Sequence, residues 1–236
     1  MPAPLVVPRV PDIDFSHLRK LGVIGDLHCE VASLERVLAH FQREGVEASV
    51  CVGDLVDGAG DANRALELLE ERSIVAVRGN HDRWLLRNEL REVPLATDLA
   101  DVSPKSRRYL ASLPLTRSIR CSRGRLLLCH GIAQNDFVGV RPEDSDESVL
   151  ALPEIAALLD DASFDFVLSG HTHRAMVRRV ERLTLFNAGT LHREYRPVCG
   201  VLDFHARRYR VFDVRSAAIE LAADWSFDEE LAFLPR

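Results

Sequence analysis

The sequence predicts a mixed α/β fold built on a parallel sheet, and the order of its apolar runs carries this prediction. Five short apolar runs lack the strict alternation of a half-exposed strand, which is typical of strands buried on both faces. They lie at residues 21–25, 49–53, 74–78, 125–130 and 164–170. Helical patterns fill the first two gaps between them. A strand-helix-strand-helix-strand opening of this kind indicates parallel strands joined by helical crossovers.

The helical patterns are recognised by apolar residues three or four positions apart, which share one face of a helix. The first gap has this spacing at Val31, Leu34, Leu38 and Phe41. The second gap begins with a helix-capping residue, Asp61, and repeats the spacing before the third strand. We expect two shorter helices, one starting at Ser103-Pro104 and one over residues 153–159.

The second half of the chain predicts antiparallel strands over residues 183–214. Residues 217–236 contain Trp225, Phe227 and Phe233 and predict a docked helix or strap, with an exposed partner-binding tail as the alternative.

We expect a single domain over residues 1–236. Its core would span about residues 20–214, with an N-terminal strap at 1–19 and a C-terminal extension at 215–236.

Composition excludes several classes of protein. Of the 236 residues, 47% are hydrophobic and 28% charged, which provides a sizeable core and argues against disorder. The net charge of −6 argues against nucleic acid or an anionic membrane as a partner. No apolar run approaches the roughly 18 to 20 residues of a membrane span. Five cysteines without a CxxC pair, and a start without signal-peptide features, predict a cytoplasmic protein with reduced thiols. The oligomeric state stays open.

Nearly every predicted strand ends in a cluster of Asp, Asn and His residues. The clusters are GDLH at 25–28, GDLVDG at 53–58, RGNHD at 78–82, CHG at 129–131 and GHTH at 170–173. A single Asp in such a place is usually a turn or cap residue, and we interpret isolated histidines such as His40 and His205 as ordinary side chains. Because the carboxyl ends of parallel strands share one edge of a sheet, five clusters there would instead fill one pocket.

The residue types in these clusters predict a metal centre. Imidazole and carboxylate groups together suit manganese, iron, nickel, cobalt or zinc, whereas calcium and magnesium rarely bind histidine. The donors exceed what one tetrahedral ion needs, and they fit two ions that share a bridging carboxylate, roughly 3.5 to 4 Å apart. We therefore expect two divalent transition-metal ions as cofactors, with Mn²⁺ preferred.

The order G-D-x-H, G-D-x-x-D, G-N-H-D, H and G-H-T-H resembles the calcineurin-like metallophosphoesterase superfamily over about residues 25–190. The resemblance implies a four-layer α-β-β-α sandwich with the metal site at one end of its two sheets. It also implies ligands for a first ion, ligands for a second ion and one bridging carboxylate. The first ion would be bound by Asp26, His28 and His173, and the second ion by Asn80, His130 and His171. The bridging carboxylate would be that of Asp54.

The resemblance also implies catalytic roles for two residues that bind no metal. His81 would protonate the leaving group or stabilise the transferring phosphoryl group, and Asp57 would orient it by hydrogen bonding. The expected reaction is attack on phosphorus by a metal-bridging hydroxide. Cys29 is interpreted as a small loop residue, with a role in sensing metal loss or oxidation as the alternative.

Departures from the family pattern narrow the expected substrate. Gly58-Ala59 stands where the phosphoprotein phosphatases have Arg-Gly, and losing that arginine removes a phosphate clamp. The FNAGT sequence at 186–190 is similar to the N-P-G-S turn of the small bacterial and archaeal phosphodiesterases. We expect small phosphate mono- or diesters as substrates, with diesters favoured. Dinucleoside polyphosphate hydrolysis, phosphoprotein phosphatase activity and, last, a non-catalytic scaffold are the alternatives.

The segment 131–150 follows a predicted ligand, is acidic and lacks a periodic pattern. We expect a surface loop here, serving either as a plain connector or as a lid over the substrate. In a lid, Asp136, Phe137 and Arg141 would make the contacts.

Overall fold

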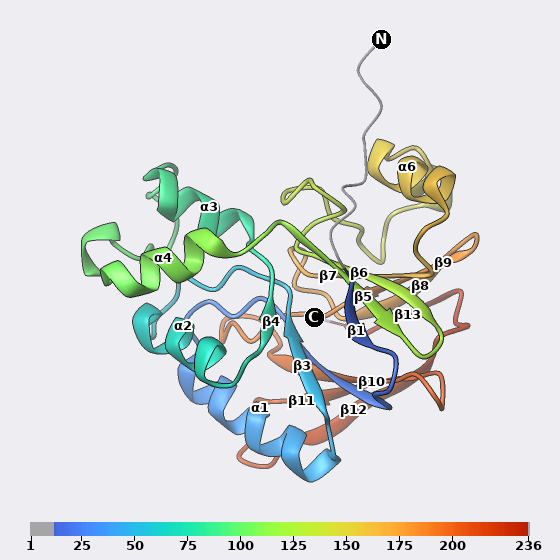
Figure 1. The fold of residues 1–236 in the computed structure, drawn as a ribbon, viewed down its shortest axis with the longest axis horizontal. Helices are drawn as coiled ribbons and strands as arrows, with labels where there is room; N and C mark the ends of the chain where they lie inside the picture. The colour runs from blue at the N-terminus through green and yellow to red at the C-terminus, as the bar shows by residue number, and fades with distance from the viewer. Residues whose placement is uncertain (1–11, 236) are drawn as a thin grey trace.

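In the computed structural model, residues 12–235 are described, and their strands form two sheets packed face to face (Figure 1). The six-stranded sheet has the spatial order β12 (Glu220–Ser226), β11 (Arg208–Asp213), β10 (Val198–Asp203), β2 (Lys20–Ile24), β3 (Ala48–Cys51) and β4 (Val75–Ala76). The seven-stranded sheet has the order β1 (Ile13–Phe15), β5 (Thr116–Cys121), β6 (Gly124–Cys129), β7 (Phe166–Ser169), β9 (Leu183–Asn187), β8 (Met176–Val180) and β13 (Leu231–Phe233).

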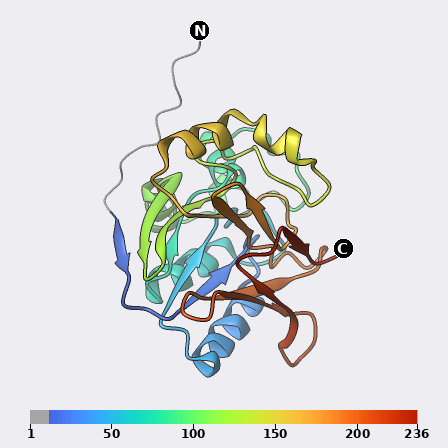
Figure 2. The same cartoon turned by 90° about the vertical axis from the view of Figure 1, so that its right-hand side faces the viewer.

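Helices cover the outer face of each sheet (Figures 1 and 2). On the six-stranded side lie α1 (Val31–Glu44), α2 (Ala62–Glu71), α3 (Asn80–Arg87), the short 3₁₀ helix η1 (Leu99–Asp101) and α4 (Pro104–Ser112). On the seven-stranded side lie α5 (Asp146–Leu150) and α6 (Pro153–Asp161). Three hydrophobic cores separate the four layers, one between the sheets and one beneath each set of helices. The predicted four-layer α-β-β-α sandwich is confirmed.

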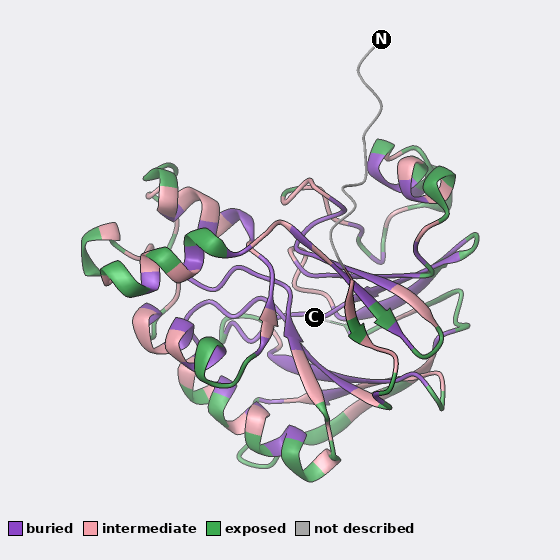
Figure 3. Ribbon diagram, in the orientation of Figure 1, coloured by how far each residue is buried: buried purple, intermediate pink, exposed green. Residues whose placement is uncertain are grey.

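Burial on both faces explains why the strand sequences do not alternate. In β2, Leu21 and Val23 face the core between the sheets, while Ile24 faces the core under the helices. Apolar residues are favoured on both sides of such a strand, because neither side meets water. Inner strands such as β7, β9 and β10 are accordingly buried along their length, whereas the helices are exposed on their outer faces (Figure 3).

The predicted elements of the first half appear at the expected places. β2, β3 and β4 pair in parallel, with α1 and α2 as their crossovers. The side chain of Asp61 accepts hydrogen bonds from the backbone N–H groups of Asn63 and Arg64, as a helix cap should. The two shorter helices are α4, capped by Ser103, and α6.

The last two predicted parallel strands belong to the other sheet. They are β6 and β7, which pair in parallel with each other in the seven-stranded sheet. The apolar pattern identifies a strand but not its sheet, so the assignment to one parallel sheet was incomplete.

The C-terminal segment differs from its prediction. Residues 217–236 were expected to form a helix or strap, but β12 pairs antiparallel with β11 and β13 pairs antiparallel with β8. The segment therefore adds one edge strand to each sheet. Phe227, which lies between these two strands, is fully buried in the core between the sheets.

At the other end of the chain, β1 pairs in parallel with β5. The predicted strap therefore includes a strand at residues 13–15, and its first eleven residues lie outside the described part of the chain. Among residues 12–235, no helix is both long enough and apolar enough to cross a bilayer.

Candidate metal centre

The five polar clusters of the sequence converge at one end of the two sheets. Asp26, Asp54 and Asn80 follow β2, β3 and β4 of the six-stranded sheet. His130 follows β6 of the seven-stranded sheet, and His171 and His173 follow β7. The site is thus divided between the sheets: three of its loops come from the six-stranded sheet and two from the seven-stranded sheet.

Two glycines of the motifs are required by close approach. A Cβ atom on Gly79 would lie 2.2 Å from Oδ1 of Asp54, and one on Gly170 would lie 2.1 Å from Oδ1 of Asp26. Both distances are far below van der Waals contact. A side chain at either position would displace a carboxylate of the site.

Six non-glycine residues of the loops adopt positive φ angles between 45° and 64°. They are His28, Cys29, Asp54, Asp57, His171 and His173. This left-handed region costs free energy for residues other than glycine, and it is concentrated at functional sites. The strand-end loops hold their side chains toward the centre at the expense of local backbone stability.

The first group of potential ligand atoms comes from Asp26, His28, Asp54 and His173, and these atoms all lie within 4.8 Å of one another. Nε2 of His173 is 3.0 Å from Oδ2 of Asp26 and 3.3 Å from Nε2 of His28. All but His173 are buried. Two imidazole nitrogens and two carboxylates directed at one point form a suitable donor set for a transition-metal cation.

The second group comprises Asp54, His130 and His171, again within 4.8 Å. Nε2 of His130 lies 3.2 Å from Oδ2 of Asp54. Asn80 joins this group, because its Oδ1 atom is 2.9 Å from Nε2 of His130 and 3.0 Å from Nδ1 of His171. Asp54 is common to both groups and has the position of a bridging carboxylate.

Backbone carbonyl groups fix the proton positions of two histidines. Nδ1 of His28 is 2.8 Å from the carbonyl oxygen of Asp57, and Nδ1 of His130 is 3.0 Å from that of Val52. A carbonyl only accepts, so Nδ1 carries the proton in each ring and the Nε2 lone pair faces the site. This support by a neighbouring acceptor is usual for histidines that bind metals. The residues therefore fit a pair of metal ions.

The charges of the site agree with this fit. Burial lowers the pKa of His28 and so favours its neutral, ligating form. Burial would also lower the pKa of His130, but the carboxylates of Asp54 and Asp26 outweigh it and raise that pKa. The same negative field would favour a cation, which competes with the proton for the ring nitrogen.

His81 and Asp57 form a hydrogen-bonded pair beside the two groups. Nδ1 of His81 is 2.8 Å from Oδ2 of Asp57. Burial acts to lower the pKa of His81, but the hydrogen bond to Asp57 and the charge of Asp54 raise it overall. Burial acts to raise the pKa of Asp57, but hydrogen bonds from His81, Thr97 and Arg91 lower it. The pair favours a protonated imidazole held by an ionised carboxylate.

Arg91 and Thr97 complete the surroundings of Asp57, and no sequence motif indicated either residue. Oδ1 of Asp57 accepts a hydrogen bond from the backbone N–H of Thr97 at 2.8 Å and another from the guanidinium of Arg91. The Thr97 hydroxyl in turn accepts from the backbone N–H of Asp57 at 3.0 Å. These residues belong to the irregular segment 88–98, which follows α3 and has no motif that could have identified them.

Asp82 connects two loops of the site through hydrogen bonds from their backbone N–H groups. Its carboxylate accepts hydrogen bonds from the backbone N–H groups of Gly79 and Leu55, both at 2.8 Å, and of Val56 at 3.3 Å. Burial and the nearby Asp54 raise the pKa of Asp82 to about 7. Asp82 thus connects the loop after β3 with the start of α3, and so positions Asp54 relative to Asn80.

Two further residues adjoin the first ligand group. The His192 ring lies 4.8 Å from that of His28, and the exposed Tyr195 ring lies 4.4 Å from that of His173, edge to face. Neither belongs to a recognisable motif. They follow the turn at 186–190, whose Asn187 side chain donates to the carbonyl of Gly170 at 2.6 Å. This turn links the histidine loop to the segment that contains Tyr195.

The segment 131–150 is partly ordered into α5, which the sequence did not predict. The exposed ring of Phe137 lies 5.2 Å from that of His171 and 6.2 Å from that of Trp84. Asp136 binds the guanidinium of Arg83 through both carboxylate oxygens, at 2.7 and 2.9 Å. Arg141 instead contacts Asp144 and Arg178 through its backbone. Two of the three expected lid residues therefore border the site.

Comparison with known proteins agrees with this arrangement. A family model described as the calcineurin-like phosphoesterase superfamily domain matches residues 20–207. The chain belongs to this superfamily. It is also 22% identical over 181 residues to an uncharacterised protein of Methanocaldococcus jannaschii, a match that covers 73% of this chain and 70% of that protein.

Solved structures of the superfamily have the same fold. A metallophosphoesterase from Sphaerobacter thermophilus is 18% identical, with a TM-score of 0.64 over 81% of this chain and 86% of its own. A structure described as a novel archaeal phosphodiesterase is 19% identical, with a TM-score of 0.52 over 81% of this chain and 98% of its own. The superfamily is metal-dependent, and membership in it supports a phosphoester hydrolase activity.

Proposed function

We propose that this protein hydrolyses small phosphate esters with two bound divalent transition-metal ions, and that diesters are its preferred substrates. The observation that carries the proposal is the pair of ligand groups that share Asp54, beside the hydrogen-bonded His81 and Asp57. Such ions, when bound, supply a nucleophile derived from water and neutralise charge on the phosphoryl oxygens. Mn²⁺ is the ion that we prefer, and the cytoplasm is the proposed location.

The proposed ligand roles follow from the two groups. The first ion would be held by Asp26, His28 and His173. The second ion would be held by Asn80, His130 and His171, and Asp54 would bind both ions. The carbonyls that accept from Nδ1 of His28 and His130 keep both rings in the ligating tautomer.

His81 would act on the leaving group as a general acid. Its Nδ1 atom is bound to Asp57, so its Nε2 atom is the one available to donate a proton to the departing oxygen. Asp57 would stabilise the protonated ring and fix its direction. Arg91 and Thr97 would keep Asp57 ionised and in place.

Steric restriction at Gly58 argues against phosphoprotein phosphatase activity. A Cβ atom at this position would lie 1.8 Å from the backbone oxygen of His28. An arginine therefore cannot stand there without moving the loop that contains His28. The similarity in fold to an archaeal phosphodiesterase and the turn at 186–190 favour diester hydrolysis instead.

The test is a substrate panel on protein reconstituted with Mn²⁺. It would include p-nitrophenyl phosphate, bis(p-nitrophenyl) phosphate, 2′,3′-cyclic nucleotides and diadenosine tetraphosphate. We expect the highest kcat/KM for a diester. Asp54→Ala, prepared identically, is the control for contaminating phosphatases and should be inactive. A metal-loaded wild type with no more activity than Asp54→Ala on every substrate would refute the proposal.

A further inference from the structure

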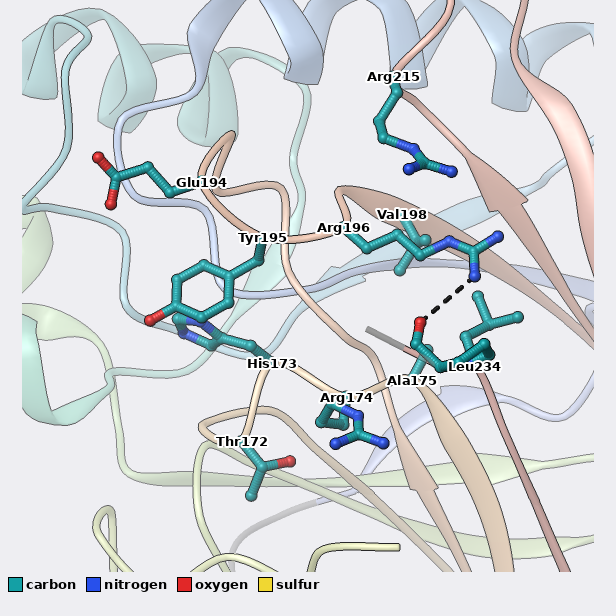
Figure 4. Close-up of a pocket in the computed structure, with 11 residues that line it drawn as sticks. Thr172, His173, Arg174, Ala175, Glu194, Tyr195, Arg196, Val198, Arg215 and Leu234 are labelled. Carbon is teal, nitrogen blue, oxygen red and sulfur yellow. Dashed lines mark hydrogen bonds between the residues drawn. The ribbon is translucent and has the colours of Figure 1, made fainter.

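A pocket of about 490 Å³ adjoins the candidate metal centre on the side of His173 (Figure 4). His173 and Tyr195 line one end of it, and Arg196 and Arg215 line the other. Because Nε2 of His173 lies 3.0 Å from Oδ2 of Asp26, the pocket begins at the edge of the first ligand group. The pocket and the first ligand group therefore share His173.

The floor of the pocket is apolar and its far end is rich in guanidinium groups. Ala175, Val198 and Leu234 are buried side chains of the floor. Arg174 lines the same pocket, and its Nε atom is buried without a hydrogen-bond partner among the described residues. The chemistry of the pocket therefore suits a ligand with an apolar body and an anionic end.

Charge at the far end is not fully balanced. Asp213 is the carboxylate that pairs with both Arg196 and Arg215, at 3.3 and 2.7 Å, so that one negative charge faces two positive ones. Arg215 binds Asp213 through Nε and Nη2. A guanidinium has five N–H donors, so others remain for an oxyanion. Glu194 also lines the pocket, but its carboxylate points away from the arginines (Figure 4).

The pocket adjoins His173, whereas His81 is not among the described residues that line it. The ring of His28 lies next to both histidines, 5.1 Å from the ring of His81 and 5.2 Å from that of His173. A phosphodiester has two substituents, one that departs beside His81 and one that stays on phosphorus. The retained substituent would then be directed toward Tyr195 and the arginines.

We infer that this pocket is a subsite for the retained substituent of a phosphodiester, and that it selects an apolar or aromatic body ending in a carboxylate or phosphate group. This inference rests on the proposed phosphodiesterase function and deepens it. Tyr195 would pack against the body, and Arg215, with Arg196, would bind the terminal oxyanion through charge-assisted hydrogen bonds.

The test uses diesters that share p-nitrophenolate as leaving group, so that the need for protonation by His81 is the same for each of them. The retained substituent would be phenyl, 4-carboxyphenyl or 4-phosphonophenyl, and p-nitrophenyl phosphate would serve as the ester with none. The two anionic diesters distinguish a carboxylate from a phosphate ligand. The variants are Arg215→Ser, Arg215→Lys and Tyr195→Ala. The matched control is Arg208→Ser, which removes an arginine paired with Asp224 at the opposite end of β11.

We expect wild type to prefer at least one anionic diester over the phenyl diester. Arg215→Ser should lower kcat/KM for the preferred anionic diester about tenfold, the usual effect of one charge-assisted hydrogen bond, and leave the phenyl diester unchanged. Arg215→Lys should restore part of this loss. Tyr195→Ala should lower kcat/KM for all three diesters but not for the monoester p-nitrophenyl phosphate. Arg208→Ser should change kcat/KM for none of these esters.

Two results would overturn the inference. One is a wild type without any preference for an anionic diester, and the other is an Arg215→Ser variant that slows anionic and phenyl diesters by the same factor. A metal-loaded wild type that cleaves no ester would refute the proposed function instead. In that case, calorimetric binding of non-hydrolysable phosphonate analogues of the three diesters still decides, because only the anionic analogues should bind Arg215→Ser more weakly.

Discussion

Nδ1 of His81 lies 2.8 Å from Oδ2 of Asp57, and the other oxygen of that carboxylate is bound by the backbone N–H of Thr97 and the guanidinium of Arg91. The carboxylate is completely buried, whereas the imidazole side chain is 21% exposed. This difference agrees with the two roles proposed for these residues. Asp57 is enclosed by protein donors, and His81 presents its other nitrogen to the space where a substrate would bind.

Replacement of His81 should separate chemistry from metal binding. We expect His81→Ala to retain its metal and to lose on the order of 10² to 10⁴ in kcat, because only the proton donor is removed. Asp54→Ala should lose metal and activity together, because Asp54 belongs to both ligand groups. Elemental analysis and steady-state kinetics of the two variants make the comparison. Equal loss of metal in both would contradict the role of His81.

The residues around Asp57 should have smaller effects in a definite order. Asp57→Asn should lower kcat about 10- to 100-fold, the range for residues that orient a functional group. Arg91→Met should lower kcat by a smaller factor than Asp57→Asn does, because the backbone N–H of Thr97 still binds the Asp57 carboxylate. Arg87→Met removes an exposed arginine from the last turn of α3 and is the control. A larger loss in Arg91→Met than in Asp57→Asn would show that the guanidinium acts on substrate directly.

Removal of metal should abolish activity reversibly and lower thermal stability. A cation that binds only the folded protein stabilises it by mass action, so Mn²⁺ should raise the melting temperature of chelated protein. Re-addition of Mn²⁺, Co²⁺ or Ni²⁺ should restore hydrolysis, with about two ions per chain by elemental analysis. Hydrolysis that persists with fewer than one ion per chain would contradict a dinuclear centre.

Phe137 provides a sharper test of the segment 131–150 than deletion of the segment would. Its exposed ring contacts His171 and Trp84, whereas Asp136 and Asn135 make structural contacts with Arg83 and Glu154. Phe137→Ala should change the ratio of kcat/KM between p-nitrophenyl phosphate and a nucleotide diester, with metal content unaltered. Leu221→Ala removes a similarly exposed apolar side chain on β12 as the control. An unchanged ratio would make this segment a plain connector.

The cysteines should be unreactive in the native, metal-loaded protein. All five are buried, and burial raises the pKa of the Cys29 thiol to about 12. At pH 8 the reactive thiolate would then be on the order of 10⁻⁴ of the total. We expect iodoacetamide to label none of them without denaturant and all five with it, measured by mass spectrometry. Rapid labelling of Cys29 in the native protein would instead support the alternative of a redox or metal-loss sensor.

The sequence predicted the parts of the site that are encoded locally. Each ligand cluster is a short motif in which a glycine and its polar neighbours determine one loop, so Asp26 and His28 could be identified without knowing their spatial neighbours. Arg91 and Thr97 could not, because Thr97 meets Asp57 across 40 residues of sequence and belongs to an irregular segment. Tyr195 was missed for the same reason.

The fold also contains elements that are encoded locally and elements that depend on tertiary contacts. Strands such as β2, buried on both faces, produce a strong apolar signal. β12 is an edge strand with partly exposed residues throughout, and its sequence, ELAADWS, has no clear period. Its identity as a strand comes from pairing with β11, which is a tertiary contact. This explains why the C-terminal segment was expected to be a helix or strap.

The division of the proposed ligands between the sheets has a consequence for complementation by fragments. A chain cut between the exposed residues Glu89 and Leu90 would leave Asp26, Asp54 and Asn80 on one piece and His130, His171 and His173 on the other. Neither piece contains a full donor set, so tight cation binding requires that both associate. Linkage then works in both directions, because an ion that binds only the associated pair also strengthens its association. Metal affinity of the mixed fragments would therefore measure how well the two pieces associate, which includes the pairing of β2 with β10 inside the six-stranded sheet.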